Sequence, residues 1–171
     1  NKLSVNFNKT DRQIKDTLEE LNDTFSTYTS ESELMLLNDY DINHSFTVSN
    51  KLSRLLLQSK DMHALLNGAW DPTIVPISQS YGFKTVASNI NQELVVGFNY
   101  LKFIDANNVV KEASIMIDLS SIAKGFAVDE LMSFVLNNMS IRGAFIDIGG
   151  EVKVFGSNAQ NKPWGIGIQS P

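Results

Sequence analysis

The segment Ile117–Leu131 places an acid, two hydroxyls and a lysine where a strand pattern passes into a helix pattern. These side chains are Asp118, Ser120, Ser121 and Lys124. The start of a helix exposes unpaired N–H groups and the positive end of the helix dipole, so a phosphate or pyrophosphate can bind there. The alternative is that a serine only caps the helix while Lys124 points to water, and spacing alone leaves both interpretations open.

Two other acidic residues could belong to a polar site. Asp71 stands before Pro72 in a loop that follows a helix pattern, so its carboxylate could accept hydrogen bonds from a ligand, although Asp before Pro more often starts a turn. Asp147 lies in an apolar strand pattern before Gly149-Gly150. A buried carboxylate there would need partners, so we expect Asp147 to face solvent.

The sequence lacks the common short motifs for nucleotide and metal sites. His44 and His63 have no metal-ligand companion at i+3 or i+4, and we predict that both are structural. A GxGxxG segment, a Walker A segment and a nucleophile elbow are all absent. Without a cysteine, disulfides and thiolate metal sites are excluded.

Helix and strand patterns supply the elements that must position these side chains. Helical spacing predicts a helix over 11–24 with a capping box at Thr10–Gln13, and a shorter helix that starts at Ser30–Glu33 and carries Leu34 and Leu37. A third helix should run from a cap at Ser49 to Gly68, with Met62 and Leu66 on its apolar face, and a fourth should follow residue 119. Alternating patterns predict strands at 3–7, 94–98, 101–104, 115–118, 144–148, 151–155 and 164–169.

These patterns favour the α+β class rather than a strict βαβ repeat. We expect a mixed, largely antiparallel sheet with packed helices, and hairpins near Asn107 and at 149–157, in a single domain over residues 1–171. Strand patterns at both ends indicate part of a longer chain, because a domain seldom ends on an unpaired strand.

The overall charge limits the class of partner. The 171 residues carry a formal net charge of -5, and no Lys/Arg cluster is present to neutralise a nucleic acid or an anionic membrane. Any anionic ligand must therefore be held locally. The apolar runs fall short of the ~20 residues that span a bilayer, and the first residues lack a basic region followed by an apolar core.

Several segments, in their order and spacing, carry a resemblance to one family. They are Phe25–Tyr28 with Ser32–Leu34 and Asn38, Gly68–Thr73, Ser80–Phe83, Ile117–Ala127 with Asp129, Asp147–Gly150 and Trp164–Gln169. Together they resemble the ApbE family of FAD:protein FMN transferases over nearly the whole chain. The resemblance implies an ApbE-like, T-fold-related architecture that would be incomplete at the C-terminus of this chain.

The resemblance implies a Mg²⁺-dependent enzyme that cleaves the pyrophosphate of FAD, releases AMP and leaves FMN esterified to a Thr or Ser hydroxyl of a target flavoprotein. The targets would be subunits of membrane redox complexes. Because family members are typically exported and lipid-anchored, it also implies an extracytoplasmic lipoprotein of the bacterial cell membrane. The signal and lipid-bearing cysteine would precede residue 1.

The resemblance also assigns site residues. By position, Tyr28 would pack on the flavin, Ala69, Trp70 and Asp71 would cradle FAD, Asp118 and Lys124 would add further FAD contacts, and Ser121 would offer a backbone carbonyl to Mg²⁺. No catalytic residue is predicted. The family's other Mg²⁺ ligands would lie beyond residue 171, and an FAD-contacting methionine would lie before residue 1.

Mg²⁺ relies on carboxylates and water to complete an octahedron, so a lone carbonyl would hold it weakly. We therefore expect the 171-residue chain alone to transfer no FMN. Two other functions stay open: a non-catalytic module that binds FAD or another nucleotide, and an FAD pyrophosphatase that uses water as the acceptor.

Overall fold

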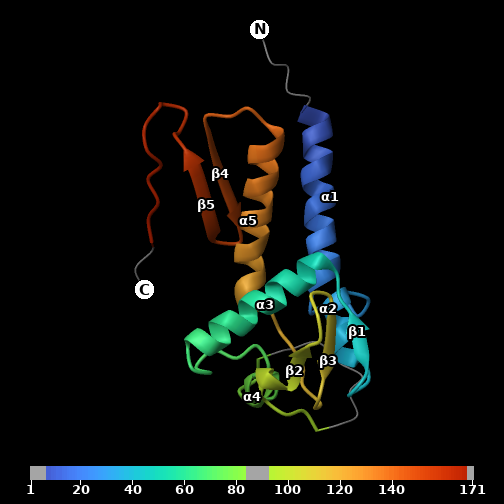
Figure 1. Cartoon of the computed structure of the whole chain (residues 1–171). Coiled ribbons are helices and arrows are strands. Elements are labelled where there is room, and N and C mark those ends of the chain that lie inside the picture. Colours follow the sequence, from blue (N-terminus) through green and yellow to red (C-terminus); the bar gives the residue numbers. More distant parts are fainter. Residues whose placement is uncertain (1–6, 84–92, 169–171) are drawn as a thin grey trace. The chain divides into compact units, whose positions relative to one another are not determined.

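The computed structural model describes residues 7–83 and 93–168, with side chains from residue 11 onward. The chain divides into two compact units, Glu19–Ala123 and Asn1–Leu18 with Lys124–Pro171 (Figure 1). The single-domain assignment over residues 1–171 stays a prediction.

The unit Glu19–Ala123 combines helices with a small antiparallel sheet (Figure 1). Strand β3 lies between its two neighbours, and Val109 of β3 faces Phe46 on one side and Phe103 on the other. The β2–β3 hairpin confirms the turn predicted near Asn107. The elements are α2 (Glu33–Asp39), β1 (Ser45–Thr47), α3 (Asn50–Leu65), α4 (Val75–Ser80), the 3-10 helix η1 (Phe98–Tyr100), β2 (Leu101–Phe103) and β3 (Asn108–Lys111).

Serine caps and leucine faces explain α2 and α3. The hydroxyls of Ser32 and Ser49 each accept an N–H from three residues ahead at 3.2 Å, which satisfies a backbone donor that a helix start leaves unpaired. The leucines that the sequence places on the apolar faces of both helices are buried, whereas Leu36, Leu57 and Leu65 on the other faces are exposed. The buried ones are Leu34, Leu37, Leu52, Leu55 and Leu56. Met62 and Leu66, predicted on the same face, are exposed, so the buried face of α3 ends before its last residues.

Two predicted strands of this unit are wrong. Residues 94–98 and 115–118 lie outside any sheet. The N–H groups of Gly97 and Phe98 donate to the side chains of Thr73 and Asp71, and both main-chain groups of Ile117 pair with a side chain of α2. At these three residues, side chains therefore make the hydrogen bonds that the backbone of a neighbouring strand would otherwise make.

Two long helices cross the boundary between the units. Helix α1 (Phe7–Phe25) begins four residues before the predicted start, so the capping box predicted at Thr10–Gln13 lies inside the helix and is wrong. Residues 7–9 include no Gly or Pro, so their helix propensity allows the helix to begin at Phe7. Phe7 is helical rather than extended, and the rest of the strand predicted at 3–7 lies outside the described residues. Helix α5 (Ser120–Asn138) confirms the helix predicted after residue 119.

The other unit contains the hairpin of β4 (Gly143–Ile148) and β5 (Glu151–Gly156), as predicted. Gly149 and Gly150 connect the strands with φ values of 60° and 98°, which glycine adopts without steric cost. Asp147 is exposed, as expected, and its carboxylate accepts the N–H of Gly150 at 2.8 Å.

The segment that follows β5 does not form the strand predicted at 164–169. Residues 164–168 lie outside any sheet, and residue 169 is beyond the described part. The indole N–H of Trp164 donates to the carbonyl of Phe155 at 3.0 Å, and its ring lies 5.6 Å from that of Phe145. The segment is thus attached to the hairpin through a side chain.

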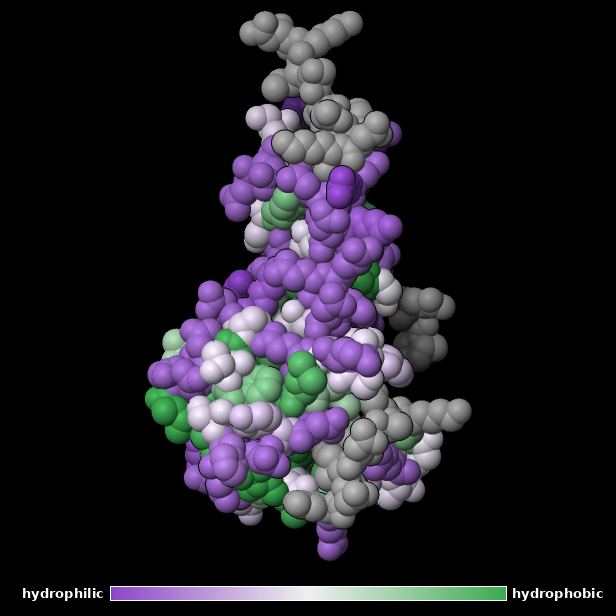
Figure 2. All heavy atoms as spheres, turned by 90° about the vertical axis from the view of Figure 1, so that its right-hand side faces the viewer, coloured by the Kyte–Doolittle hydropathy of each residue, from purple (hydrophilic) through white to green (hydrophobic). Residues whose placement is uncertain are grey.

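The helices and antiparallel sheets confirm the α+β class. Hydrophilic side chains cover much of the face in Figure 2, and apolar ones reach the surface in patches between them. Among residues 7–83 and 93–168, no helix has the length and hydropathy needed to cross a bilayer.

Candidate functional site

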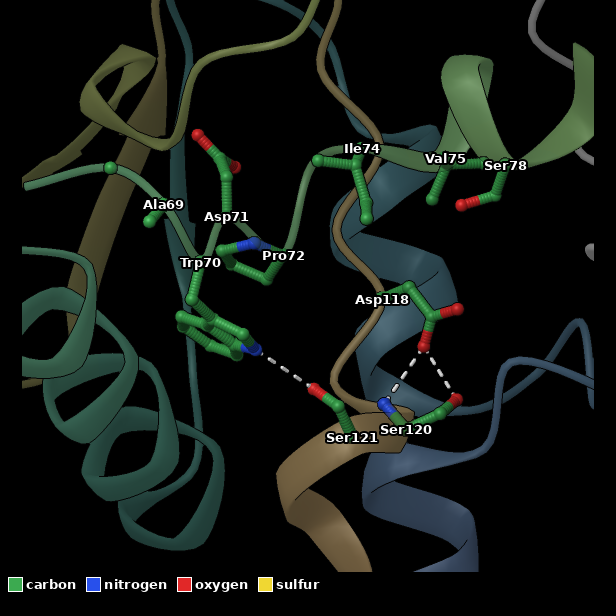
Figure 3. Close-up of a pocket in the computed structure, with 11 residues that line it drawn as sticks. Ala69, Trp70, Asp71, Pro72, Ile74, Val75, Ser78, Asp118, Ser120 and Ser121 are labelled. Atoms are coloured by element: carbon green, nitrogen blue, oxygen red, sulfur yellow. Dashed lines mark hydrogen bonds between the residues drawn. The ribbon is translucent and has the colours of Figure 1, made fainter. Parts of the chain in front are cut away.

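A pocket of about 360 Å³ lies within the unit Glu19–Ala123 (Figure 3). Its volume falls in the range of small-molecule sites. The loop after α3 and the start of α5 form its walls. The lining residues are Gly68, Ala69, Trp70, Asp71, Pro72, Ile74, Val75, Ser78, Asp118, Ser120 and Ser121.

The Asp71 carboxylate organises the loop that carries it. One oxygen accepts the N–H of Thr73 at 2.8 Å and its hydroxyl at 2.6 Å, and the other accepts the N–H of Phe98 at 3.1 Å. The hydroxyl oxygen of Thr73 in turn accepts the N–H of Gly97 at 2.7 Å. Asp71 therefore starts a turn, and its carboxylate points away from Asp118 and Ser121 in Figure 3.

His63 supports the same loop from the last turn of α3. Its Nδ1 lies 2.9 Å from the carbonyl oxygen of Trp70 and 3.5 Å from a carboxylate oxygen of Asp71. The imidazole is largely buried, with 14% of its side chain exposed. These contacts agree with the predicted structural role of His63.

Trp70 connects the loop to the start of α5. Its indole N–H donates to the hydroxyl of Ser121 at 3.2 Å, across 51 residues of sequence (Figure 3). The indole and the Asp71 carboxylate leave the loop in opposite directions. One side chain therefore serves the pocket wall while its neighbour holds the loop together.

Asp118 lies at the helix start for which the sequence left two interpretations open, a phosphate site and a plain serine cap. Its carboxylate accepts the N–H of Ser120 at 2.8 Å and the Ser120 hydroxyl at 2.5 Å. This places a negative charge at the positive end of the helix dipole, a favourable arrangement. An anionic ligand at this corner would lie beside that charge, and the described residues lining the pocket include no Lys, Arg or His.

Two residues assigned by resemblance do not line the pocket. Tyr28 is 85% exposed, and its backbone N–H donates to the hydroxyl of Ser26 at 3.1 Å. The ammonium of Lys124 lies 2.8 Å from a carboxylate oxygen of Glu151 and 3.5 Å from the carbonyl of Gly149. This ion pair, which the sequence did not indicate, belongs to the unit that contains the hairpin.

The described residues do not make a complete Mg²⁺ site. Within the described ranges, no group of three or more His, Cys, Asp or Glu side chains is placed to hold a metal. Ser121 lies in the first turn of α5, and Asp118 is the neighbouring carboxylate in the pocket. One carboxylate and one carbonyl fit only part of the octahedron that Mg²⁺ requires.

Sequence reasoning missed the residues that close the pocket beyond the loop. Ile74, Val75 and Ser78 line it from α4 and its start, and no helix was predicted there. Pro76 falls in the first turn of α4, where a missing N–H costs nothing, and this was the available signal. Val75 also packs in the core against Met35 and Met116.

A sequence model of the ApbE family matches residues 2–171. This chain belongs to the ApbE family. The FAD:protein FMN transferase of Vibrio cholerae is 32% identical over 169 residues, which cover 93% of this ApbE chain and 50% of the relative. The transferase of Haemophilus influenzae is 28% identical over 184 residues, which cover 99% and 53%.

Solved structures give the same assignment. The flavin transferase ApbE from Vibrio cholerae matches all of this chain and 58% of its own, with a TM-score of 0.88 and 28% identity. This similarity confirms the ApbE-like fold. The chain spans about half the length of the curated relatives it matches.

Proposed function

We propose that this ApbE chain binds FAD in the pocket between residues 68–75 and the start of α5, as part of an FAD:protein FMN transferase. The supporting observation is that one pocket unites Ala69, Trp70, Asp71, Asp118 and Ser121, the residues assigned to FAD and Mg²⁺ by resemblance alone. The named activity of the relatives points to the same ligand.

The reaction exchanges one phosphate linkage for another. The phosphoanhydride bond of FAD breaks between its two phosphorus atoms, and a Thr or Ser hydroxyl oxygen of the target protein bonds to the phosphorus of FMN. AMP leaves with the bridging oxygen, and the hydroxyl proton passes to a base or to water. Such transfers require mainly positioning and charge neutralisation from the protein.

The chain's own residues account for positioning. Trp70 offers an indole face held by Ser121, and the turn fixed by Asp71 sets the position of that indole. Asp118 and Ser120 hold the start of α5 in place. Charge neutralisation is the part that the described lining residues leave unsupplied, because Asp118 is itself negative.

We also propose that turnover requires Mg²⁺, with further ligands supplied from outside residues 7–83 and 93–168. The remaining assignments by resemblance are part of the same proposal. Tyr28 would contact the flavin, Lys124 would contact FAD, and the Ser121 carbonyl would contact the metal. The target would be a subunit of a membrane redox complex, and the protein would be an extracytoplasmic lipoprotein.

The test compares the complete protein with the 171-residue chain. Each is incubated with FAD, Mg²⁺ and a target flavoprotein subunit, while AMP release and protein-bound flavin fluorescence are followed. The complete protein should produce both signals and lose both on chelation of Mg²⁺. The 171-residue chain should produce neither, because its described residues do not complete a Mg²⁺ site.

Other outcomes separate the remaining functions. AMP release without flavin on the target would indicate an FAD pyrophosphatase, and FAD binding without AMP would indicate a non-catalytic binding module. Flavinylation of the target by the 171-residue chain would contradict the expectation that this chain alone is inactive.

A further inference from the structure

Asn38 is a buried polar residue that the proposed function does not use. It lies in the last turn of α2 and is 1% exposed. Its side-chain amide donates to the carbonyl of Ile117 at 2.9 Å, and its side-chain oxygen accepts the N–H of Ile117 at 2.8 Å. One side chain thus satisfies both main-chain groups of a residue 79 positions away, as a neighbouring strand would.

This clamp lies immediately before the pocket. The next residue, Asp118, donates its N–H to the carbonyl of Pro72 at 2.8 Å, and its carboxylate holds the start of α5. Ile117 and Asp118 are therefore fixed in succession, the first by α2 and the second by the pocket loop. No sheet holds the segment 115–118, so these bonds set where Asp118 lies.

Asn38 is itself held firmly. The buried ammonium of Lys111 donates to the backbone carbonyl of Asn38, which anchors the end of α2 to β3. The Asn38 amide also lies 3.6 Å from the sulfur of Met35, which packs in the core with Val75 and Met116. Because Asn38 is fixed in this way, its side chain determines where the Ile117 main chain lies and does not shift to follow it.

We infer that Asn38 is a positioning residue for the FAD pocket, acting through the Ile117 main chain to set Asp118 and the first turn of α5. The inference rests on the proposed function. It adds a residue from α2 that does not line the pocket, and it gives a structural reason for the asparagine at position 38.

The test uses the complete protein with Asn38→Leu, which keeps the shape of the side chain and removes its donor and acceptor. Hydrogen exchange at the amides of Ile117, Asp118 and Ser120 should become faster. The Kd for FAD, measured by calorimetry under conditions where the variant is folded, should rise about tenfold, the effect of losing one to two buried hydrogen bonds.

Ser53→Ala is the matched control. Its hydroxyl donates to the carbonyl of Ala106, so this variant also loses a long-range side-chain bond to the backbone of a residue in the same unit, but outside the pocket. Ser53 is 5% exposed. Ser53→Ala should lower the urea midpoint and leave the Kd for FAD unchanged.

A double-mutant cycle separates positioning from general stability. If Asn38 acts through Asp118, then Asn38→Leu should change the Kd by less than about twofold in an Asp118→Ala background, because the group that it positions is gone. A merely structural role would give the same loss in both backgrounds. If Asn38→Leu does not fold, Asn38→Ser replaces it in every arm.

The outcomes distinguish this inference from the function on which it rests. A wild-type protein that does not bind FAD would refute both. A wild-type protein that binds FAD, with a folded Asn38 variant of unchanged Kd or with an equal loss in Ser53→Ala, would refute the positioning role alone.

Discussion

Asp71 accepts hydrogen bonds from Thr73 in its own loop and from Phe98 at the start of η1, so its replacement acts beyond its own turn. In Asp71→Asn, the new amide group would face an N–H donor that needs an acceptor. We expect the free energy of unfolding to fall by about 1–3 kcal/mol, the cost of leaving buried groups unpaired. Urea denaturation measures this loss, and FAD affinity should fall as the loop that bears Trp70 loosens.

Asp105→Asn is the control for this substitution. Asp105 accepts the N–H groups of Asn107 and Asn108 at 2.9 Å, but it lies in an exposed turn away from the pocket. Its loss of stability should be smaller because water can replace the missing partners, and FAD affinity should not change. Equal effects of the two variants on FAD affinity would contradict the role given to Asp71.

The indole N–H of Trp70 provides a prediction for which the second tryptophan, Trp164, serves as the control. Trp70→Phe keeps an aromatic face and removes the N–H that donates to Ser121. We expect the Kd for FAD to rise about two- to tenfold, the equivalent of one hydrogen bond. Trp164→Phe removes a comparable bond, to Phe155, and should leave the Kd unchanged. Fluorescence titration of both variants decides between local and general effects.

Elements that repeat a local pattern could be predicted from the sequence, whereas those that depend on distant partners could not. The cap at Ser49 and the Gly149-Gly150 hairpin follow from residues within a few positions. The start of α2 was placed at Ser30–Glu33, and the structure shows that Ser32 is the residue that caps it. By contrast, the segment 115–118 has a strand pattern but pairs with a side chain of α2, which period-two spacing cannot reveal.

The site shows the same division. The loop and the helix start were located because Asp71 stands before Pro72 after a helix pattern and Asp118 stands where a strand pattern passes into a helix pattern. Trp70 was assigned by resemblance alone. The hydrogen bonding of both Asp71 carboxylate oxygens was not predictable, because it depends on residues up to 27 positions away. The pairing of Lys124 with Glu151 likewise depends on how the hairpin folds back, which spacing does not encode.

The β4–β5 hairpin provides a prediction at the scale of one element. Gly156 has a φ of 62°, and a Cβ added there would lie 2.0 Å from the carbonyl oxygen of Arg142. Gly150 has a φ of 98° and an open space around the same position. Both substitutions to alanine introduce backbone strain of about 1 kcal/mol or more, but only Gly156→Ala adds a collision with the backbone.

We therefore expect Gly156→Ala to reduce the free energy of unfolding distinctly more than Gly150→Ala. Urea denaturation followed by circular dichroism measures both, and hydrogen exchange across β4 and β5 should show opening confined to the hairpin in the first variant. Similar losses in the two variants would mean that the close approach of Gly156 to Arg142 is not maintained in solution.

Stability as a function of pH belongs to the whole molecule. Burial lowers the pKa of Lys111 from 10.5 to about 8, although Asp39 and Asp41 oppose this shift. Between pH 8 and 10.5 the unfolded chain holds this proton and the folded chain releases it, so the free energy of unfolding should rise with pH in that window. Below pH 8 the cost of burying the charged form is fully present.

Lys111→Met should remove this rise, as measured by urea denaturation at several pH values between 8 and 10.5. Lys102→Met is the matched control from the neighbouring strand, because it deletes an exposed lysine and leaves Lys111 intact. That variant should keep the rise. A parallel pH profile for Lys111→Met and the parent would show that this ammonium is solvated in the folded protein.

The contact between His63 and the Trp70 carbonyl has a consequence for ligand selection. Because the imidazole belongs to α3, displacing the loop beneath the indole would require a shift of that helix or the loss of a buried contact. A ligand that needs a wider pocket could therefore bind only if the helix α3 moved, and not by movement of a surface loop alone. The pocket should select ligands by their shape, independently of their charge.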